Sequence, residues 1–158
     1  MRTGLRHEFD APFYSRGYNP TVAILRLKIA ALEAAEDALI FGSGSAAIAA
    51  AVMSSVKGGE HIICVQKPYS WTKKLLLNLL SKYGVESTMV DGTLVGNFES
   101  AIRKNTRLIF LESPNSMTFE MQDIEESCKL AKRRNILTIV DNSYSSPLFQ
   151  QPILLGAD

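Results

Sequence analysis

The hydrophobic positions of this chain gather in four short runs that are separated by segments with helical spacing. The four runs are nearly continuous in apolar and β-branched residues, and they span 60–66, 85–91, 107–113 and 136–141. Strands whose side chains are apolar on both sides are typical of parallel sheets that helices cover on both faces. The pattern therefore predicts a parallel sheet built from these four segments.

Apolar side chains recur at helical spacing between these runs and before the first of them. The helical segments cover 22–36, 46–56, 70–83, 96–104 and 122–134. Lys57, Gly58 and Gly59 are predicted to end the second of these helices, and Gly84 the third, because glycine adopts the left-handed conformation of a C-cap. Strands that alternate with helices predict an α/β fold with a doubly wound, mostly parallel sheet.

The chain is predicted to have an arm and one main domain. With 158 residues it can form one well-buried domain but not two of ordinary size. Residues 1–36 are predicted to form an N-terminal arm and the first helix, because the stretch 7–21 is polar and aromatic, contains two prolines and has no periodicity. Residues 37–158 are predicted to form the α/β domain.

Charge and cysteine content exclude several classes of function. The chain has 17 basic and 16 acidic side chains, so nothing in its charge favours nucleic acid or an anionic membrane surface. No segment approaches the ~20 apolar residues of a membrane-spanning helix, and the N-terminus has no signal-peptide core. Cys64 and Cys128 lack the spacing of a metal or redox site, which fits a reducing compartment. We expect a cytoplasmic protein that binds no metal, nucleic acid or membrane.

A glycine-rich segment is the first candidate for a binding site. The sequence DALIFGSGSAAIAAA, residues 37–51, leads from a short apolar strand through Gly42, Ser43, Gly44 and Ser45 into a helix. Free N–H groups and the positive end of the helix dipole would meet there, and both favour an anion. Alternatively, the glycines serve only a tight turn and close packing of the helix.

The same segment formally matches the dinucleotide fingerprint, as Gly42-x-Gly44-x-x-Ala47. That motif needs an acidic residue about 20 positions further on, at the end of the next strand, where it holds the ribose. The next strand here is followed by Gln66 and Lys67. A nicotinamide-dinucleotide domain is therefore a weaker alternative.

Four other residues are candidates for ligand contacts. Asp141 ends the strand 136–141, where open α/β sheets bind ligands; it would pair with a protonated pyridine nitrogen or only cap the next turn. Tyr69 follows the strand 60–66, and its ring would stack on a flat heterocycle or pack in the core. Tyr14 and Arg16 lie two positions apart on what we expect to be extended chain, which would point both toward one phosphate.

Five motifs in sequence order support a more specific hypothesis. They are YSRGYNPT, FGSGSAAI, PYSWT, ESPNSMTFEMQDI and VDNSYSSPLF. Together they resemble the Cys/Met-metabolism family of pyridoxal-phosphate (PLP) enzymes, from about Phe13 to Asp158. The resemblance implies the large domain of fold type I, the fold of aspartate aminotransferase, and makes this chain its N-terminal part, truncated before the C-terminal elements.

The resemblance also implies roles for individual residues. The backbone N–H groups of Gly44 and Ser45 would bind the cofactor phosphate, and Tyr14 and Arg16 would reach the phosphate of a neighbouring subunit. Tyr69 would stack on the pyridine ring and assist proton transfer as the one catalytic side chain. The remaining contacts would come from Asp141, at the ring nitrogen, and Ser116, near the 3-oxygen.

One motif points to a branch of the family. Cystathionine γ-synthases and γ-lyases usually carry Asn-Pro where this chain has Ser116-Met117. A Gly-Ser pair is typical of cystathionine β-lyases, so the chain resembles that branch, with Asn115 in place of the glycine as a residue that tolerates the left-handed conformation. The implied reaction is β-elimination of cystathionine to homocysteine, pyruvate and ammonia, a trans-sulfuration step of methionine biosynthesis.

The chain shows no Schiff-base lysine of the family, which follows a Ser-x-x-Thr-Lys motif. We therefore expect it to be inactive alone and to act as a homo-oligomer or with a complementing C-terminal half. An unpaired sheet edge would favour such association. The alternative is a non-catalytic module that binds PLP or another subunit.

Overall fold

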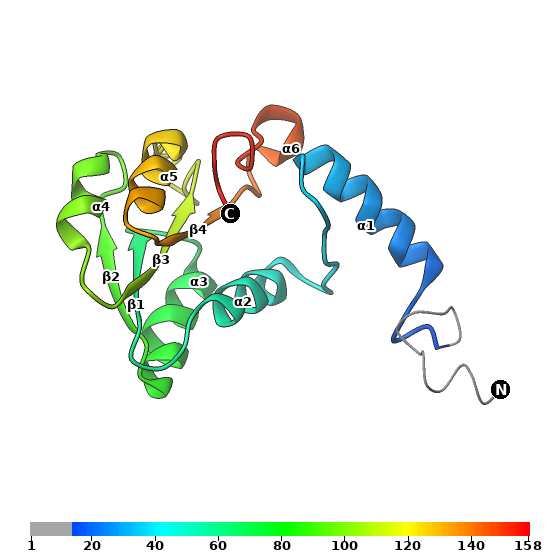
Figure 1. Cartoon of the computed structure of the whole chain (residues 1–158), viewed down its shortest axis with the longest axis horizontal. Coiled ribbons are helices and arrows are strands. Elements are labelled where there is room, and N and C mark those ends of the chain that lie inside the picture. The colour runs from blue at the N-terminus through cyan, green and yellow to red at the C-terminus, as the bar shows by residue number, and fades with distance from the viewer. Residues whose placement is uncertain (1–13) are drawn as a thin grey trace. The chain divides into compact units, whose positions relative to one another are not determined.

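Four parallel strands form one sheet in the computed structural model, which describes residues 14–158 (Figure 1). The strands are β1 (His61–Val65), β2 (Glu86–Val90), β3 (Thr106–Glu112) and β4 (Leu137–Asp141), in the order β2-β1-β3-β4. All three neighbouring pairs are parallel. The predicted strands and their parallel arrangement are confirmed.

The helices cover both faces of this sheet. They are α2 (Gly44–Ser55), α3 (Ser70–Lys74), α4 (Val95–Ala101) and α5 (Ile124–Arg133), and a short α6 (Ser146–Phe149), which buries no residue, follows β4. The chain moves outward from β1 to β2 and then crosses back to β3, so right-handed crossovers place α3 on the face opposite α4 and α5. Figure 1 shows α2 and α3 on one side of the strands and α4 and α5 on the other. The doubly wound α/β architecture is confirmed.

The order of the strands reverses between β1 and β3, and this position locates the site. The first connection from β1 leads to one neighbour and the later connections lead past β1 to the other side. Loops that leave such a pair of strands diverge to opposite faces and open a crevice at their carboxyl ends. Tyr69 follows β1, and the ESPNS segment begins at the end of β3.

Glycines end one predicted helix but not the other. After α3 the helix continues as a π-helical turn over Leu75–Leu79 and a 3-10 helix over Leu80–Tyr83, and Gly84 ends it in the left-handed region at φ 76°. By contrast, α2 ends at Ser55 and Val56 is extended, so the predicted C-cap at Lys57, Gly58 and Gly59 is wrong. Gly58 is needed instead for close contact, since a Cβ there would lie 2.8 Å from the carbonyl oxygen of Tyr83.

The structure divides into two compact units, residues 1–40 and 41–158. In the first, α1 (Pro20–Glu33) is capped by Asn19, whose side chain accepts a hydrogen bond from the Thr21 N–H at 3.0 Å. The predicted range of 22–36 therefore needs correction at both ends. The polar stretch at 7–13, predicted as part of an arm, lies outside the described residues.

The predicted strand at the start of the glycine-rich segment is absent. Residues 38–41 are assigned to neither helix nor strand, and Leu39, Ile40 and Phe41 are all exposed. A strand needs a neighbour to complete its ladder of hydrogen bonds, and none of the strands within 14–158 pairs with this segment. The apolar pattern alone did not show that a partner is required.

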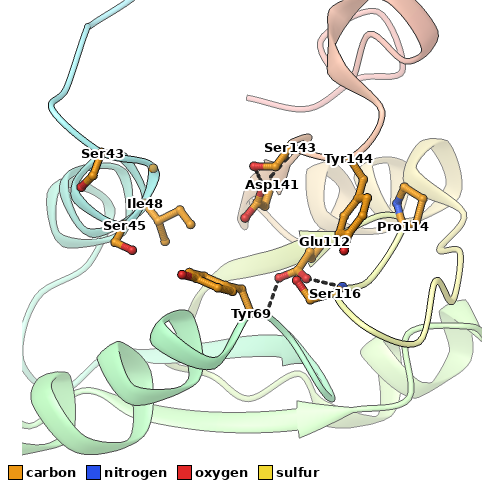
Figure 2. A pocket seen from close by; sticks show the side chains of 11 residues that line it. Ser43, Ser45, Ile48, Tyr69, Glu112, Pro114, Ser116, Asp141, Ser143 and Tyr144 are labelled. Carbon is orange, nitrogen blue, oxygen red and sulfur yellow. Dashed lines mark hydrogen bonds between the residues drawn. The ribbon is translucent and has the colours of Figure 1, made fainter.

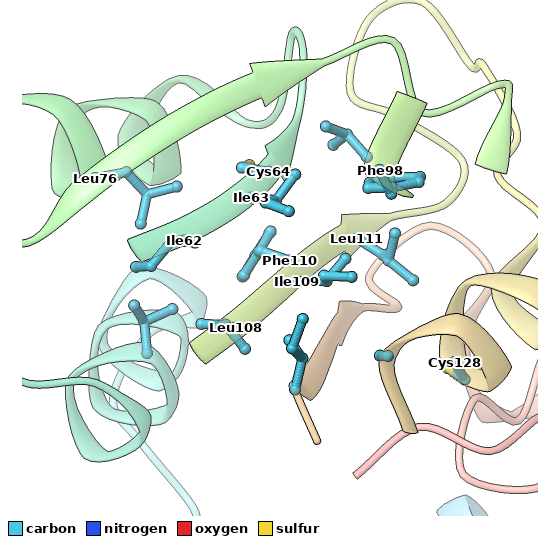
Figure 3. Packing of buried hydrophobic residues seen from close by; sticks show 14 of the residues in the cluster. Ile62, Ile63, Cys64, Leu76, Phe98, Leu108, Ile109, Phe110, Leu111 and Cys128 are labelled. Carbon is cyan, nitrogen blue, oxygen red and sulfur yellow. The ribbon is translucent and has the colours of Figure 1, made fainter. Parts of the chain in front are cut away.

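The core lies between the central strands and the helices of the second unit (Figure 3). Every residue of β1 is buried, and so are residues 108–112 of β3, whereas β2 and β4 are largely half-buried. Three buried side chains from helices pack against these strands: Phe98 of α4, Leu76 of the π-helical turn after α3, and Cys128 of α5. Burial is therefore greatest at the two strands whose carboxyl ends border the crevice.

Two absences apply to the described residues. Within residues 14–158 no helix has the length and apolar character needed to cross a membrane. In the same range no cluster of three or more His, Cys, Asp or Glu side chains could hold a metal ion.

Cys64 and Cys128 are free and buried, and burial raises the pKa of both thiols, so neither suits a nucleophile.

Candidate functional site

A pocket of about 450 Å³ opens at the carboxyl ends of β1, β3 and β4 (Figure 2). One wall is the N-terminus of α2, and the opposite wall is formed by the strand ends and the loops that follow them. The pocket lies wholly within the second unit. Of the predicted site residues it brings together Gly44, Ser45, Tyr69, Ser116 and Asp141.

The α2 wall has free backbone donors. Ser43 is the N-cap, and its Oγ accepts a hydrogen bond from the Ala46 N–H at 3.2 Å. The N–H groups of Gly44 and Ser45 donate to no acceptor within residues 14–158. Both residues line the pocket, and a Cβ added to Gly44 would meet no atom within 4 Å. Their N–H groups are the positive end of a 12-residue helix, which suits an anion.

Asp141 caps the turn after β4 and keeps one carboxylate oxygen free. Its Oδ1 accepts hydrogen bonds from the N–H of Ser143 at 3.0 Å and from the Ser143 hydroxyl at 2.6 Å. This is the turn cap that follows many strand-end aspartates. Oδ2 has no partner in the described part of the chain, and the side chain lines the pocket. One carboxylate oxygen is therefore available to a ligand that donates a hydrogen bond.

The sequence motifs did not single out Glu112, which also lines the pocket. Its side chain is 2% exposed. Oε2 accepts a hydrogen bond from the Tyr69 N–H at 2.7 Å, and Oε1 accepts one from the Ser116 N–H at 2.6 Å. A charged residue at the end of a strand predicted to be buried was the signal that could have identified it, since glutamate is seldom buried without partners.

Glu112 and Asp141 stand on the same wall. They are partners in the β3–β4 ladder, and partners in a parallel pair direct their side chains to the same face of the sheet. No lysine or arginine lines the pocket among residues 14–158.

Tyr69 and Ser116 also line the pocket. Tyr69 is 39% exposed, and Figure 2 shows its ring extending away from Glu112 toward Ser45 and Ile48 of α2. Ser116 begins the outer part of the loop after β3 and lines the pocket beside Glu112. Both residues are held through their backbone N–H groups, which leaves their side chains available to a ligand.

Buried amides fix the loop that carries Ser116. The Gln122 side chain accepts a hydrogen bond from the Glu112 N–H at 3.2 Å and donates one to Asn115 Oδ1 at 2.9 Å. Asn115 tolerates the left-handed conformation but does not adopt it; Met117 and Phe119 do. The reason is that the Asn115 N–H pairs with the carbonyl oxygen of Glu120 at 2.9 Å, which places the sharp bend after Asn115.

Tyr14 and Arg16 belong to the first unit, and their chain is not extended as predicted. The N–H groups of Gly17 and Tyr18 both donate to the Tyr14 carbonyl oxygen, at 2.8 and 2.9 Å, so the segment forms a turn. The turn brings the Arg16 guanidinium to 4.8 Å from the centre of the Tyr14 ring. Their contact with a cofactor phosphate stays a prediction.

The pocket has opposite electrostatic character on its two walls. Unpaired N–H groups at the start of α2 favour negative charge, whereas Glu112 and the free oxygen of Asp141 favour a cation or a hydrogen-bond donor. Figure 2 shows the two groups on opposite sides of the pocket. The arrangement fits a small dipolar molecule with an anionic end and a protonated nitrogen. The pyridinium and phosphate of PLP have this chemistry.

Comparison with known proteins agrees with this chemistry. A sequence model of the Cys/Met metabolism PLP-dependent enzymes matches residues 2–158. The chain is 39% identical to a cystathionine γ-lyase of Bacillus subtilis over 92% of its own length and 38% of the relative. It is 37% identical to the cystathionine β-lyase MetC of Staphylococcus haemolyticus over 92% of this chain and 37% of that one.

A solved structure has the same fold. The crystal structure of metB from Corynebacterium glutamicum superimposes with a TM-score of 0.89 at 37% sequence identity, over 94% of this chain and 40% of that one. The chain thus spans less than half the length of these similar proteins.

Proposed function

Because this chain belongs to the Cys/Met metabolism PLP-dependent enzyme family, we propose that its pocket binds PLP and serves a carbon–sulfur lyase that acts on a sulfur amino acid. The observation that carries the proposal is the dipolar pocket, with free N–H groups on the α2 wall and a free Asp141 oxygen on the other. A lone glycine-rich turn would not require the second wall.

Each wall has a separate task in this proposal. The Gly44 and Ser45 N–H groups bind the phosphate, and the Tyr69 ring stacks on the pyridine. Asp141 Oδ2 holds the proton on the ring nitrogen, and the Ser116 hydroxyl lies near the 3-oxygen. Bound PLP supplies an electron sink for the α-carbon of a substrate amino acid. A carboxylate beside the ring nitrogen keeps that nitrogen protonated, which favours this role.

The narrower proposal is a cystathionine β-lyase. It is supported by Ser116-Met117 in the position where γ-lyases and γ-synthases usually carry Asn-Pro, and by β-lyases among the relatives. The reaction consumes cystathionine and water and releases homocysteine, pyruvate and ammonia, with cleavage of the bond between the β-carbon and sulfur. The Tyr69 hydroxyl, which lies at the pocket, is proposed to assist in moving the substrate proton.

Binding and turnover are separable for this chain. Since the described pocket has no lysine, we propose that the 158-residue chain binds the cofactor and does not turn substrate over alone. Activity would require an added C-terminal half, or a homo-oligomer in which Tyr14 and Arg16 reach the phosphate of a neighbouring copy. A non-catalytic module that binds PLP is the second candidate, favoured by the same lack of a lysine.

Binding can be tested with pyridoxine 5′-phosphate, which lacks the aldehyde of PLP and so does not react with surface lysines. Trp71 is the single tryptophan and lies two residues after Tyr69, so quenching of its fluorescence reports a bound pyridine. We expect saturable quenching, weaker binding of pyridoxine without phosphate, and no response to NAD⁺. A folded chain that binds NAD⁺ and not pyridoxine 5′-phosphate would overturn the proposal.

Turnover is measured by pyruvate release from cystathionine in the presence of PLP. We expect none from the chain alone. Pyruvate release by the purified chain would contradict the proposed inactivity and leave the cofactor assignment intact. Release of a thiol from methionine but not from cystathionine, once a complementing half is added, would contradict the β-lyase assignment.

A further inference from the structure

Glu112 is the most completely buried charged side chain among the residues that line the pocket, at 2% exposure. It has no cationic partner in the described part of the chain. Its two oxygens instead accept the N–H groups of two residues that come from different loops, Tyr69 after β1 and Ser116 after β3. These are the two loops that diverge at the reversal of strand order.

A buried carboxylate is costly unless hydrogen bonds satisfy it, and both contacts here are short, at 2.7 and 2.6 Å. Short bonds of this kind, between an ionised acceptor and an N–H donor, are stronger than neutral ones. The rigid strand β3 holds Glu112 from below, and Gln122 fixes its backbone N–H at 3.2 Å. Glu112 therefore joins the two loops at the pocket itself, whereas the Lys67–Glu120 ion pair and the Asn115 amide, which donates to the Lys67 carbonyl oxygen at 3.5 Å, connect them at Lys67.

We propose that Glu112 is a positioning residue that sets the distance between the Tyr69 ring and Ser116, and so the width of the slot that receives the pyridine ring. The inference rests on the proposed function only in naming the ring as the occupant. Within the part of the chain that the structure describes, the Glu112 side chain makes no hydrogen bond to the α2 wall, where the phosphate is proposed to bind. Its loss should weaken recognition of the ring and not recognition of the phosphate.

The test is Glu112→Gln, which keeps the size of the side chain. A glutamine has one oxygen and one NH₂, so it can accept only one of the two N–H groups and turns a donor toward the other. We expect affinity for pyridoxine 5′-phosphate to fall about tenfold or more, because one charge-assisted hydrogen bond is lost and one of the two loops is no longer held by the side chain. Affinity for inorganic phosphate, followed by amide shifts of Gly44 and Ser45, should stay within about twofold.

A purely structural role predicts a different result. If Glu112 only stabilised the fold, the variant would lose phosphate and pyridoxine 5′-phosphate binding together, or lose neither. Either outcome would overturn the proposal. Glu112→Asp is the second variant if Glu112→Gln does not fold, because it keeps the charge but is one methylene too short to reach both loops; the same split between the two ligands is expected.

Glu120→Gln is the matched control. Glu120 is a carboxylate of the same loop and pairs at 3.0 Å with Lys67 of the loop that carries Tyr69, but within residues 14–158 its side chain makes no hydrogen bond to Tyr69 or Ser116. It should leave both affinities unchanged, and a tenfold loss with this variant would show that the slot depends on any link between the two loops and not on the Glu112 contacts.

Hydrogen exchange separates this inference from the proposed function. The Tyr69 and Ser116 amides should be protected in the unliganded wild type and should lose protection in Glu112→Gln while the amides of β1 keep theirs. If wild type binds no pyridoxine 5′-phosphate, the proposed function fails and the exchange experiment still decides whether Glu112 joins the loops. Equal protection in the variant and wild type would overturn the inference.

Discussion

Asp141 shows how one side chain can serve both the turn and the ligand. Oδ1 accepts two hydrogen bonds from Ser143, and Oδ2 is left for the pocket. The strand that ends in Asp141 was expected to be central, but β4 lies at the edge of the described sheet. The sequence left open whether the residue caps a turn or binds a cation. The structure shows the cap and leaves the second oxygen free, so the two functions do not compete for one atom.

Asp141→Asn should lower affinity for pyridoxine 5′-phosphate about tenfold, because a neutral amide replaces a charged acceptor at the ring nitrogen. The measurement is again Trp71 quenching. Stability should change little, since the amide oxygen can still accept from Ser143.

Asp91→Asn is the control for this change. Asp91 follows β2 and makes the same turn, with Oδ1 accepting from the Thr93 N–H at 3.0 Å and from the Thr93 hydroxyl at 2.6 Å. It does not line the pocket. If Asp91→Asn weakened binding as much as Asp141→Asn, the turn and not the ligand contact would explain both.

At the scale of elements, the strands and most helices were predictable because their signals are local. A run such as 107–113 is apolar enough to identify a buried strand without knowledge of its neighbours. The segment at 38–41 was not predictable in the same way, since its pairing depends on a partner that the sequence pattern does not contain. Likewise, Glu112 accepts a hydrogen bond from the Tyr69 N–H across 43 positions of sequence, and no local pattern records that contact.

Gly58, which follows α2, allows a test of one such contact between residues that are distant in sequence. Gly58 approaches the carbonyl oxygen of Tyr83, and a Cβ would lie 2.8 Å away, against backbone that cannot easily move. We expect Gly58→Ala to lower the free energy of unfolding by about 1–3 kcal/mol, as measured by urea denaturation. A helix-cap role would give no such steric cost, because alanine is tolerated where φ is negative.

Gly96→Ala is the matched control for Gly58→Ala. Gly96 lies in α4, and a Cβ there would meet no atom within 4 Å. This change should raise stability by about 0.5–1 kcal/mol, since alanine loses less backbone entropy in a helix. A stabilising Gly58→Ala would contradict the close contact between the two turns.

At the scale of the whole molecule, the two ends of the sheet have different tasks. The carboxyl ends of the strands form the pocket, whereas the amino ends contain a buried polar cluster around His61. On the outer edge of β4, the Thr138 N–H and hydroxyl both pair with Asp158 Oδ2, at 3.0 and 2.9 Å. This contact occupies part of the edge that was predicted to favour association. Oligomer formation stays a prediction, to be measured by sedimentation.

The His61 cluster makes stability depend on pH. The ring is fully buried, and its Nδ1 and Nε2 are hydrogen-bonded to the hydroxyls of Thr106 and Thr88 at 2.8 and 2.9 Å. Burial is the main cause that lowers the His61 pKa, and the Arg103 charge adds to it, while Glu86 opposes both. The neutral ring is thus favoured in the folded state.

The sign of the effect follows from proton linkage. A histidine whose pKa is lower in the folded state binds fewer protons there than in the unfolded chain, so its stabilising contribution is complete above the unfolded pKa of about 6.5 and is lost as the pH falls below it. We expect the free energy of unfolding to decrease from pH 7 to pH 5 and the decrease to be smaller in His61→Gln. Because the cluster lies at the other end of the sheet, phosphate binding at Gly44 and Ser45 should be unchanged in this variant at pH 7. An identical pH dependence in wild type and variant would show that the His61 ring is not the group that titrates.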